Sequence, residues 1–224
     1  MKRFLALCMF ASSAAQAGTC PTRATLDALA KDAWDGATAQ PTCTAIRARE
    51  PLTFVVDIAT FEGKRPPRGF DPVLNGGRGY AAIIDGHGTV RWHQESASEA
   101  PGDWYDWQLV DLDGDGRDEL IAHHVHFGHM SASSEELFVY TIGNGEATEA
   151  TALPLADHVP AKGFEQNSCT SAYRLVRDGG RTVIEIVGKR GNDPDLTPVN
   201  DVACPGAGKH VYRWTGKDLV EKHG

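Results

Sequence analysis

The sequence predicts a mainly β protein, built as an antiparallel meander of hairpins with one small N-terminal helix. Four pairs of β-prone runs flank short turns that contain glycine, the pattern of consecutive antiparallel hairpins. The strands fall into three loose groups, at 52–93, 107–153 and 171–222. The three groups fit three propeller-like blades, although closed propellers usually have at least four. An open twisted meander and a β-sandwich fit the pattern equally well.

The predicted helix spans 22–35, where apolar residues recur at helical spacing. Thr22 can cap its start and Gly36 can end it. We therefore expect a small helical N-terminal segment at 18–50 and a β domain at 51–224.

Each predicted hairpin is centred on a turn with at least one glycine, the residue that most readily adopts a positive φ. The hairpins pair 80–84 with 89–93, 137–142 with 147–153, 173–176 with 182–187, and 210–214 with 218–221. A further strand is expected at 52–58. Stretches rich in proline and glycine predict long loops at 64–79 and 188–208.

The first 17 residues have the form of a secretory signal peptide. Lys2 and Arg3 precede an apolar stretch at 4–11, and small residues at 15–17 fit a cleavage site. The apolar run is too short to span a bilayer. The sequence thus predicts a periplasmic or secreted protein without a membrane span.

The chain is acidic. Its formal net charge of −8 would become −10 once the signal, with two basic residues and no acidic ones, is removed. A chain with this charge and no basic run is a poor ligand for nucleic acids and anionic membranes. The remaining 207 residues suit one domain, and we expect a monomer.

Four cysteines remain after the signal, an even number that indicates disulfides in an exported chain. Four cysteines allow three pairings. We favour Cys20 with Cys43 and Cys169 with Cys204, because these pairs close local loops. Zinc is the alternative, but no close Cys-x-x-Cys pair is present.

The residues between 111 and 119, here called the acidic loop, have the layout of a short calcium-binding loop. Asp111, Asp113 and Asp115 alternate at positions one, three and five, and a glycine at position six allows a sharp turn. Arg117 would offer its backbone carbonyl at position seven, and Glu119 would close the shell at position nine. The expected ion is Ca²⁺, which prefers six to eight oxygen ligands.

The loop differs from an EF-hand, which needs a glutamate at position twelve, where this chain has Ala122. The residues at 120–127 read as a strand rather than an exiting helix. With that strand, the stretch 107–127 resembles a single copy of the FG-GAP or VCBS-type repeat of integrin α-chain propellers. The resemblance implies a β-propeller-like setting and one set of calcium ligands: Asp111, Asp113, Asp115, the Arg117 carbonyl and Glu119.

Four histidines follow the acidic loop and suggest a second kind of metal chemistry: His123, His124, His126 and His129. His124 and His126 share a strand face and, with a nearby glutamate, have the residue types of a zinc site. The more ordinary interpretation, which we favour, is that they face solvent or border the core.

Aromatic residues precede the acidic loop. Alternation places Tyr105 and Trp107 on one strand face, where we expect burial, and leaves Trp104 as the surface candidate for stacking on a sugar or anchoring a protein partner.

No nucleophile or phosphate-loop motif is present, so catalysis is not the favoured reading. We predict an exported, disulfide-stabilised calcium protein acting as a non-catalytic binding or inhibitor module. The alternative is a metal-dependent hydrolase that uses the histidine cluster.

Overall fold

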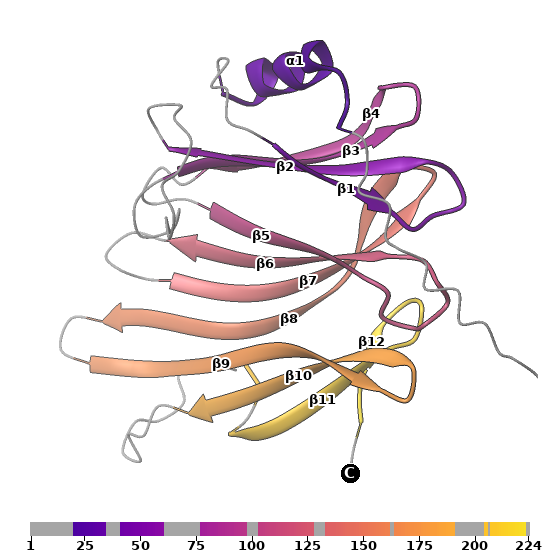
Figure 1. Ribbon diagram of the computed structural model, residues 1–224. Coiled ribbons are helices and arrows are strands. Elements are labelled where there is room, and N and C mark those ends of the chain that lie inside the picture. The colour runs from indigo at the N-terminus through magenta and orange to yellow at the C-terminus, as the bar shows by residue number, and fades with distance from the viewer. Residues whose placement is uncertain are drawn as a thin grey trace, which may run out of the picture.

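The strands pair antiparallel in chain order in the computed structural model of the chain, which confirms the predicted mainly β meander (Figure 1). The structure describes residues 20–34, 41–60, 77–97, 103–127, 133–161, 164–190, 204–205 and 207–222. One helix, α1 (Arg23–Trp34), precedes the strands. The strands are β1 (Thr42–Ile46), β2 (Leu52–Thr60), β3 (Gly77–Asp85), β4 (Val90–Ala97), β5 (Asp103–Val110), β6 (Glu119–Phe127), β7 (Ser133–Gly143), β8 (Glu146–Ala161), β9 (Phe164–Asp178), β10 (Arg181–Arg190), β11 (Gly208–Trp214) and β12 (Leu219–Glu221).

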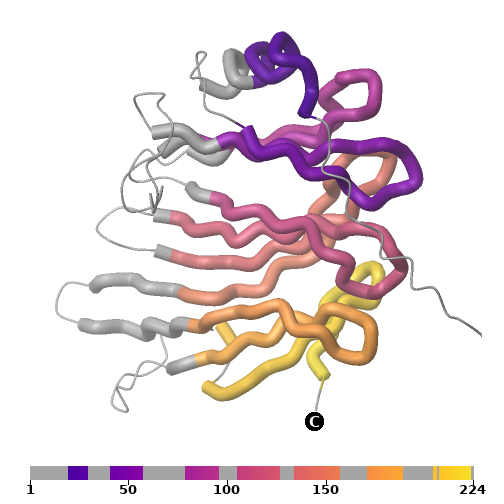
Figure 2. The backbone as a smooth tube through the Cα atoms, viewed as in Figure 1, coloured from indigo at the N-terminus to yellow at the C-terminus, as the bar shows by residue number. Residues whose placement is uncertain are grey.

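The strands stack as three groups of four. Strands β1 to β4 form one open sheet and β5 to β12 form another, in which β8 pairs with β9 along Ala156–Ala161. We call β1–β4, β5–β8 and β9–β12 the first, second and third strand groups. Figure 2 shows them as successive layers running from indigo to yellow, with α1 above the first. The three predicted groups of strands are thus present.

Alternation of side chains along each strand builds a separate core between each pair of layers. In β3, Tyr80 and Ile84 pack under α1, whereas Ala81 and Ile83 face the second strand group. In β6, Leu120 faces the first strand group. Ile121, the next residue, faces the third strand group. It belongs to a core made of Leu112, Ile121, Leu137, Val139, Leu155, Ile184, Ile186 and Trp214.

The N-terminal helix begins as expected. Thr22 caps it, because its Oγ1 accepts a hydrogen bond from the backbone N–H of Thr25 at 3.3 Å. Leu26 and Leu29 are buried against the first strand group. The predicted disulfide between Cys20 and Cys43 is present, with the two Cα atoms 5.2 Å apart, and ties the helix to β1.

Strand β1 departs from the expected helical segment at 18–50. It pairs with β2 from Thr42 to Ile46, so the N-terminal segment supplies the edge strand of the first sheet. Three of its five side chains are hydroxyl-bearing or small, and one is the bridged cysteine. Its burial alternates along the strand, but the run is short and has only one large apolar side chain, so the sequence pattern did not indicate a strand.

All four predicted hairpins are present. Their strands are longer than the sequence indicated, except β12, which begins one residue later than predicted. In the β3–β4 turn, the Asp85 carboxylate accepts hydrogen bonds from the N–H groups of His87 and Thr89, both at 2.9 Å. These bonds and the nearby Arg91 hold the pKa of Asp85 below its usual range, with the Thr89 bond as the largest cause. In the β7–β8 turn, Asn144 has a left-handed φ of 53°.

Several predictions fall wholly or partly outside the described residues. These are the signal peptide, most of the two long loops, His129 and the side chains of Trp104 and Cys169. Cys204 is disulfide-bonded, which is compatible with its predicted pairing. Within the described part of the chain, no helix has the length and apolarity needed to cross a membrane.

Candidate metal centre

The acidic loop connects β5 to β6 and gathers three carboxylates. Within the described residues, Asp111, Asp113 and Asp115 each offer an oxygen atom, and these atoms all lie within 4.8 Å of one another. Asp111 is buried and Asp115 is exposed, so the cluster runs from the core to the surface. The arrangement provides three oxygen ligands for a metal ion.

The backbone of the loop folds around its own carboxylates. Asp111 accepts a hydrogen bond from the N–H of Gly114 at 2.7 Å, and Asp113 accepts one from the N–H of Asp115 at 3.1 Å. Asp115 in turn accepts one from the N–H of Arg117 at 2.8 Å. Gly114 adopts a φ of 79°, which favours glycine. These local bonds hold the three aspartates on one side of the turn.

Glu119, the predicted last ligand, is buried just beyond the three-aspartate cluster. Its Oε2 accepts a hydrogen bond from the N–H of Leu112 at 2.8 Å. Burial raises the pKa of Glu119 to about 7, the Leu112 bond opposes this, and the negative charges of the three aspartates add to the rise. The ion-free loop is therefore crowded with negative charge.

Arg117, whose backbone carbonyl was the predicted fourth ligand, is exposed. Its Nε lies 3.7 Å from Oδ2 of Asp115, with both side chains about half exposed. At this distance and exposure the contact is a weak surface pair. The side chain thus remains beside the loop and partly offsets its charge.

Sequence reasoning missed the strongest contact of the loop, between Asp118 and Arg47. Asp118 accepts hydrogen bonds from the backbone N–H of Arg47 at 2.7 Å, from its Nε at 2.9 Å and from its Nη2 at 2.5 Å. The backbone N–H of Asp118 donates back to the Arg47 carbonyl at 3.0 Å. The Asp118 side chain is only 5 % exposed. The bond to Asp118 is the largest cause that raises the pKa of Arg47 above its ordinary value.

Arg47 also reaches the metal cluster, because its Nη1 lies 3.6 Å from Oδ2 of Asp111. Arg47 lies between β1 and β2, 71 positions before Asp118 in the chain. No local spacing joins residues so far apart, and an arginine after a short strand is common on surfaces. The acidic residue at position eight of the loop was the only available signal.

The acidic loop touches the third strand group as well. The N–H of Thr182 donates to the Leu112 carbonyl at 3.1 Å. A Cβ atom at Gly114 would lie 2.9 Å from the Gly180 carbonyl oxygen, so only glycine fits there without displacing the β9–β10 turn. Because Arg47 belongs to the first strand group, the loop contacts all three groups.

The histidines of β6 divide between its two faces. His123 faces the third strand group, where its Nε2 lies 2.9 Å from Oε2 of Glu135 and its ring meets the edge of Tyr173 at 5.6 Å. His124 and His126 lie on the opposite face, with ring centroids 6.4 Å apart. The strand itself therefore separates His123 from the other two.

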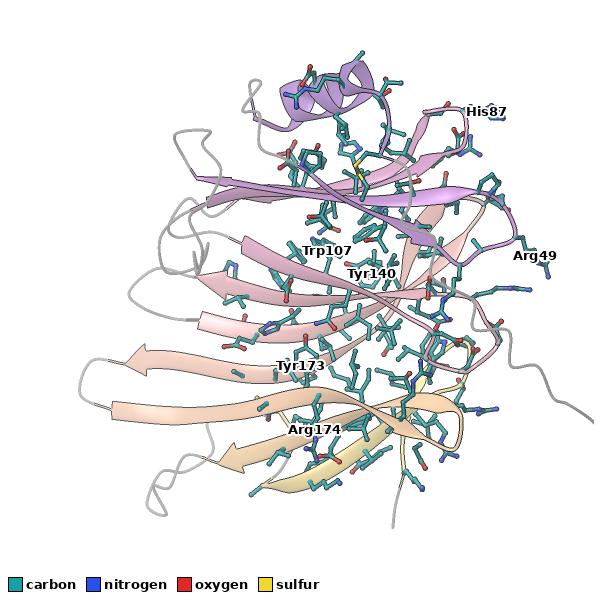
Figure 3. All side chains as sticks on the ribbon, in the orientation of Figure 1. Arg49, His87, Trp107, Tyr140, Tyr173 and Arg174 are labelled. Carbon is teal, nitrogen blue, oxygen red and sulfur yellow. A yellow bond between two sulfur atoms is a disulfide. The ribbon has the colours of Figure 1, made fainter. Side chains whose placement is uncertain are left out.

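His124 is buried in an aromatic stack. Its ring lies parallel to Tyr105 at 4.4 Å, and its Nδ1 lies 3.6 Å from Oε2 of Glu136. Tyr105 stacks in turn on Trp107 at 5.2 Å, as the shared strand face predicted. Figure 3 shows Trp107 and Tyr140 between the first and second strand groups, which places the stack inside a core. Among the described residues, no histidine joins a cluster of gathered ligand atoms.

The fold and the site together define a mainly β protein with an acidic cluster that could hold a metal ion. Comparisons with protein families, curated proteins and solved structures found no match.

Proposed function

We propose that this chain is an exported, disulfide-stabilised calcium-binding protein that acts as a non-catalytic binding or inhibitor module. The observation that carries the proposal is the gathering of Asp111, Asp113 and Asp115 at the point where all three strand groups meet. The calcium ion would serve as a clamp that holds these groups together.

Calcium suits this site because every gathered ligand atom is a carboxylate oxygen, the hard donor that calcium prefers. Magnesium demands near-octahedral geometry and keeps several waters, whereas calcium accepts irregular shells such as a folded turn provides. Burial is the main cause that raises the pKa of Glu119, and a bound cation would offset the repulsion from the three aspartates that adds to it. The resemblance of the loop to an FG-GAP or VCBS-type repeat supports the same choice.

Export rests on the signal-like N-terminus and on the bridge between Cys20 and Cys43, which is compatible with an oxidising compartment. The binding role rests on the lack of a nucleophile motif and on a candidate surface around Trp104. The hydrolase alternative stays a prediction. The division of the histidines across β6 does not favour it.

A melting experiment tests the calcium clamp. Calcium at about 100 times its dissociation constant adds about 2.7 kcal/mol to the free energy of unfolding. For a chain of this size that energy corresponds to a rise in Tm of about 5–10 °C over the protein in EDTA. Asp113→Asn should abolish the rise, because it removes one ligand charge from the centre of the cluster.

Asp218→Asn is the matched control, since Asp218 lies on an exposed turn between β11 and β12. It should retain the full calcium-dependent rise. An equal Tm in calcium and EDTA for the unmodified protein would refute the clamp.

A further inference from the structure

A cavity of about 400 Å³ opens beside the acidic loop. It lies between the β1–β2 connection and the β7–β8 turn, and its size falls in the range of small-molecule sites. Its apolar lining comes from Ala48, Leu52 and Ile142, which also belong to the core between the first and second strand groups. One wall of the cavity is therefore apolar and is part of the protein core.

The charged lining of this cavity is mostly cationic. Arg47, Arg49 and Arg117 line it together with two carboxylates, those of Glu50 and Asp118. Asp118 already accepts three hydrogen bonds from Arg47. The five charged side chains sum to +1, a positive sign that is unexpected on a chain whose net charge is −8.

Two of the three guanidinium groups are available to a ligand. Arg49 is exposed, and no ion pair or hydrogen bond joins its side chain to the rest of the described chain. It projects from the β1–β2 connection at the margin of the molecule (Figure 3). The Arg117 side chain is half exposed, and among the described residues its one ion pair is the 3.7 Å contact with Asp115. Asn144 adds a side-chain amide from the facing turn.

We propose that this cavity binds an oxyanion, a carboxylate or a phosphate group, carried on a small apolar body. The planar guanidinium groups of Arg49 and Arg117 match the paired oxygens of such an anion. The apolar body would lie against Leu52 and Ile142. Arg47 adds positive charge behind the anion while remaining bound to Asp118.

We expect calcium to strengthen this oxyanion site, an expectation that rests on the proposed function. An ion held by Asp115 competes with Arg117 for the same carboxylate, so Arg117 turns to the cavity. The ion also adds positive charge near the anion. We therefore expect oxyanion binding to be several-fold tighter in calcium than in EDTA.

The test uses NMR titration of the full mature chain with three probes in saturating calcium. N-acetyl-leucine supplies a carboxylate on an apolar body, phenyl phosphate supplies a phosphate, and N-acetyl-leucinamide is the uncharged match of the first. At least one anion should bind about tenfold more tightly than the amide, which is ~1.4 kcal/mol. The anion that binds shows whether the site takes a carboxylate or a phosphate.

Variants locate the site. Arg49→Gln and Arg117→Gln should each weaken anion binding severalfold, and the Arg117 variant keeps the backbone carbonyl predicted to bind calcium. Arg91→Gln is the control, because Arg91 is partly exposed on β4 and does not line the cavity. Equal binding of the anions and the amide, or anion binding that survives Arg49→Gln unchanged, overturns the proposal.

The same titration in EDTA separates this site from the calcium clamp. Anion binding that depends on Arg49 in both conditions with equal affinity supports the cavity site and overturns its coupling to calcium. The calcium clamp itself is judged by the melting of Asp113→Asn, which involves none of the probes.

Discussion

The ionisable side chains of the acidic loop and those of strand β6, its neighbour in the chain, have opposite kinds of neighbours. In the loop, Asp113 and Asp115 lie beside other carboxylates, and their charge adds to that of Asp111. In β6, His123 lies beside Glu135, and His124 lies between Tyr105 and Glu136. The histidines lie beside a carboxylate or an aromatic ring. The aspartates crowd one another, and their partners are loop N–H groups and two half-exposed arginines.

This difference indicates that the aspartate cluster, rather than the histidines, needs an external ion to balance its charge. A group of like charges is relieved by a cation or a proton. The pKa of Glu119 is raised first by burial, and the charges of the three aspartates add to the rise. Histidines that already stack on an aromatic ring or contact a carboxylate gain little from a metal. Residue types alone suggested metal sites in both places, and only the neighbours distinguish them.

The largest effect is expected from Arg47→Ala, which would leave the buried Asp118 without its guanidinium partner. Loss of one partner from a buried ion pair costs about 3–5 kcal/mol. Since Arg47 is itself half exposed, we expect about 3 kcal/mol in urea unfolding. Arg49→Ala, two residues along the same connection, should change stability by no more than about 0.5 kcal/mol. Similar losses in both variants would contradict the bridging role of Arg47.

A smaller effect is expected from His124→Ala, which opens a cavity in the aromatic stack and should cost about 2 kcal/mol. His124→Phe should recover most of that loss, because an aromatic ring restores the contact with Tyr105. Urea unfolding with and without added zinc measures both variants. Zinc that stabilises the unmodified protein but not His124→Phe would revive the hydrolase alternative.

The smallest effect is a pH dependence of the ion-free protein. The folded pKa of Glu119, about 7, lies above its ordinary value of 4.5, so the folded state favours the protonated carboxyl. The corresponding stability is fully present below pH ~4.5 and is lost as the pH rises through ~7. In EDTA, Tm should fall by a few degrees between pH 5 and 8. Glu119→Gln should flatten this slope; a slope that is unchanged would assign the pH dependence to other groups.

Much of the fold was predictable because its signals are local. Glycine turns between β-prone runs marked four hairpins, and Thr22 marked the start of α1. The alternating aspartates likewise predicted the cluster that the structure assembles. The pairing of Cys20 with Cys43 followed from their short separation.

The remainder depends on contacts between distant segments. The bond between Arg47 and Asp118 spans 71 positions, and the contact of Thr182 with Leu112 spans a similar distance. Strand β1 forms because β2 offers it an edge, although its own five residues include only one large apolar side chain. The cavity beside the loop requires two turns from different strand groups to face each other. No spacing within the sequence indicates these long-range contacts.

A calorimetric titration of the mature chain with calcium, after EDTA treatment and dialysis, tests the central claim most directly. The clamp predicts one calcium bound per chain, and no measurable binding at the same concentrations by Asp113→Asn. Asp218→Asn should bind as the unmodified protein does. Absence of calcium binding by the unmodified chain, or undiminished binding by Asp113→Asn, would contradict the assignment of the acidic loop as a calcium site.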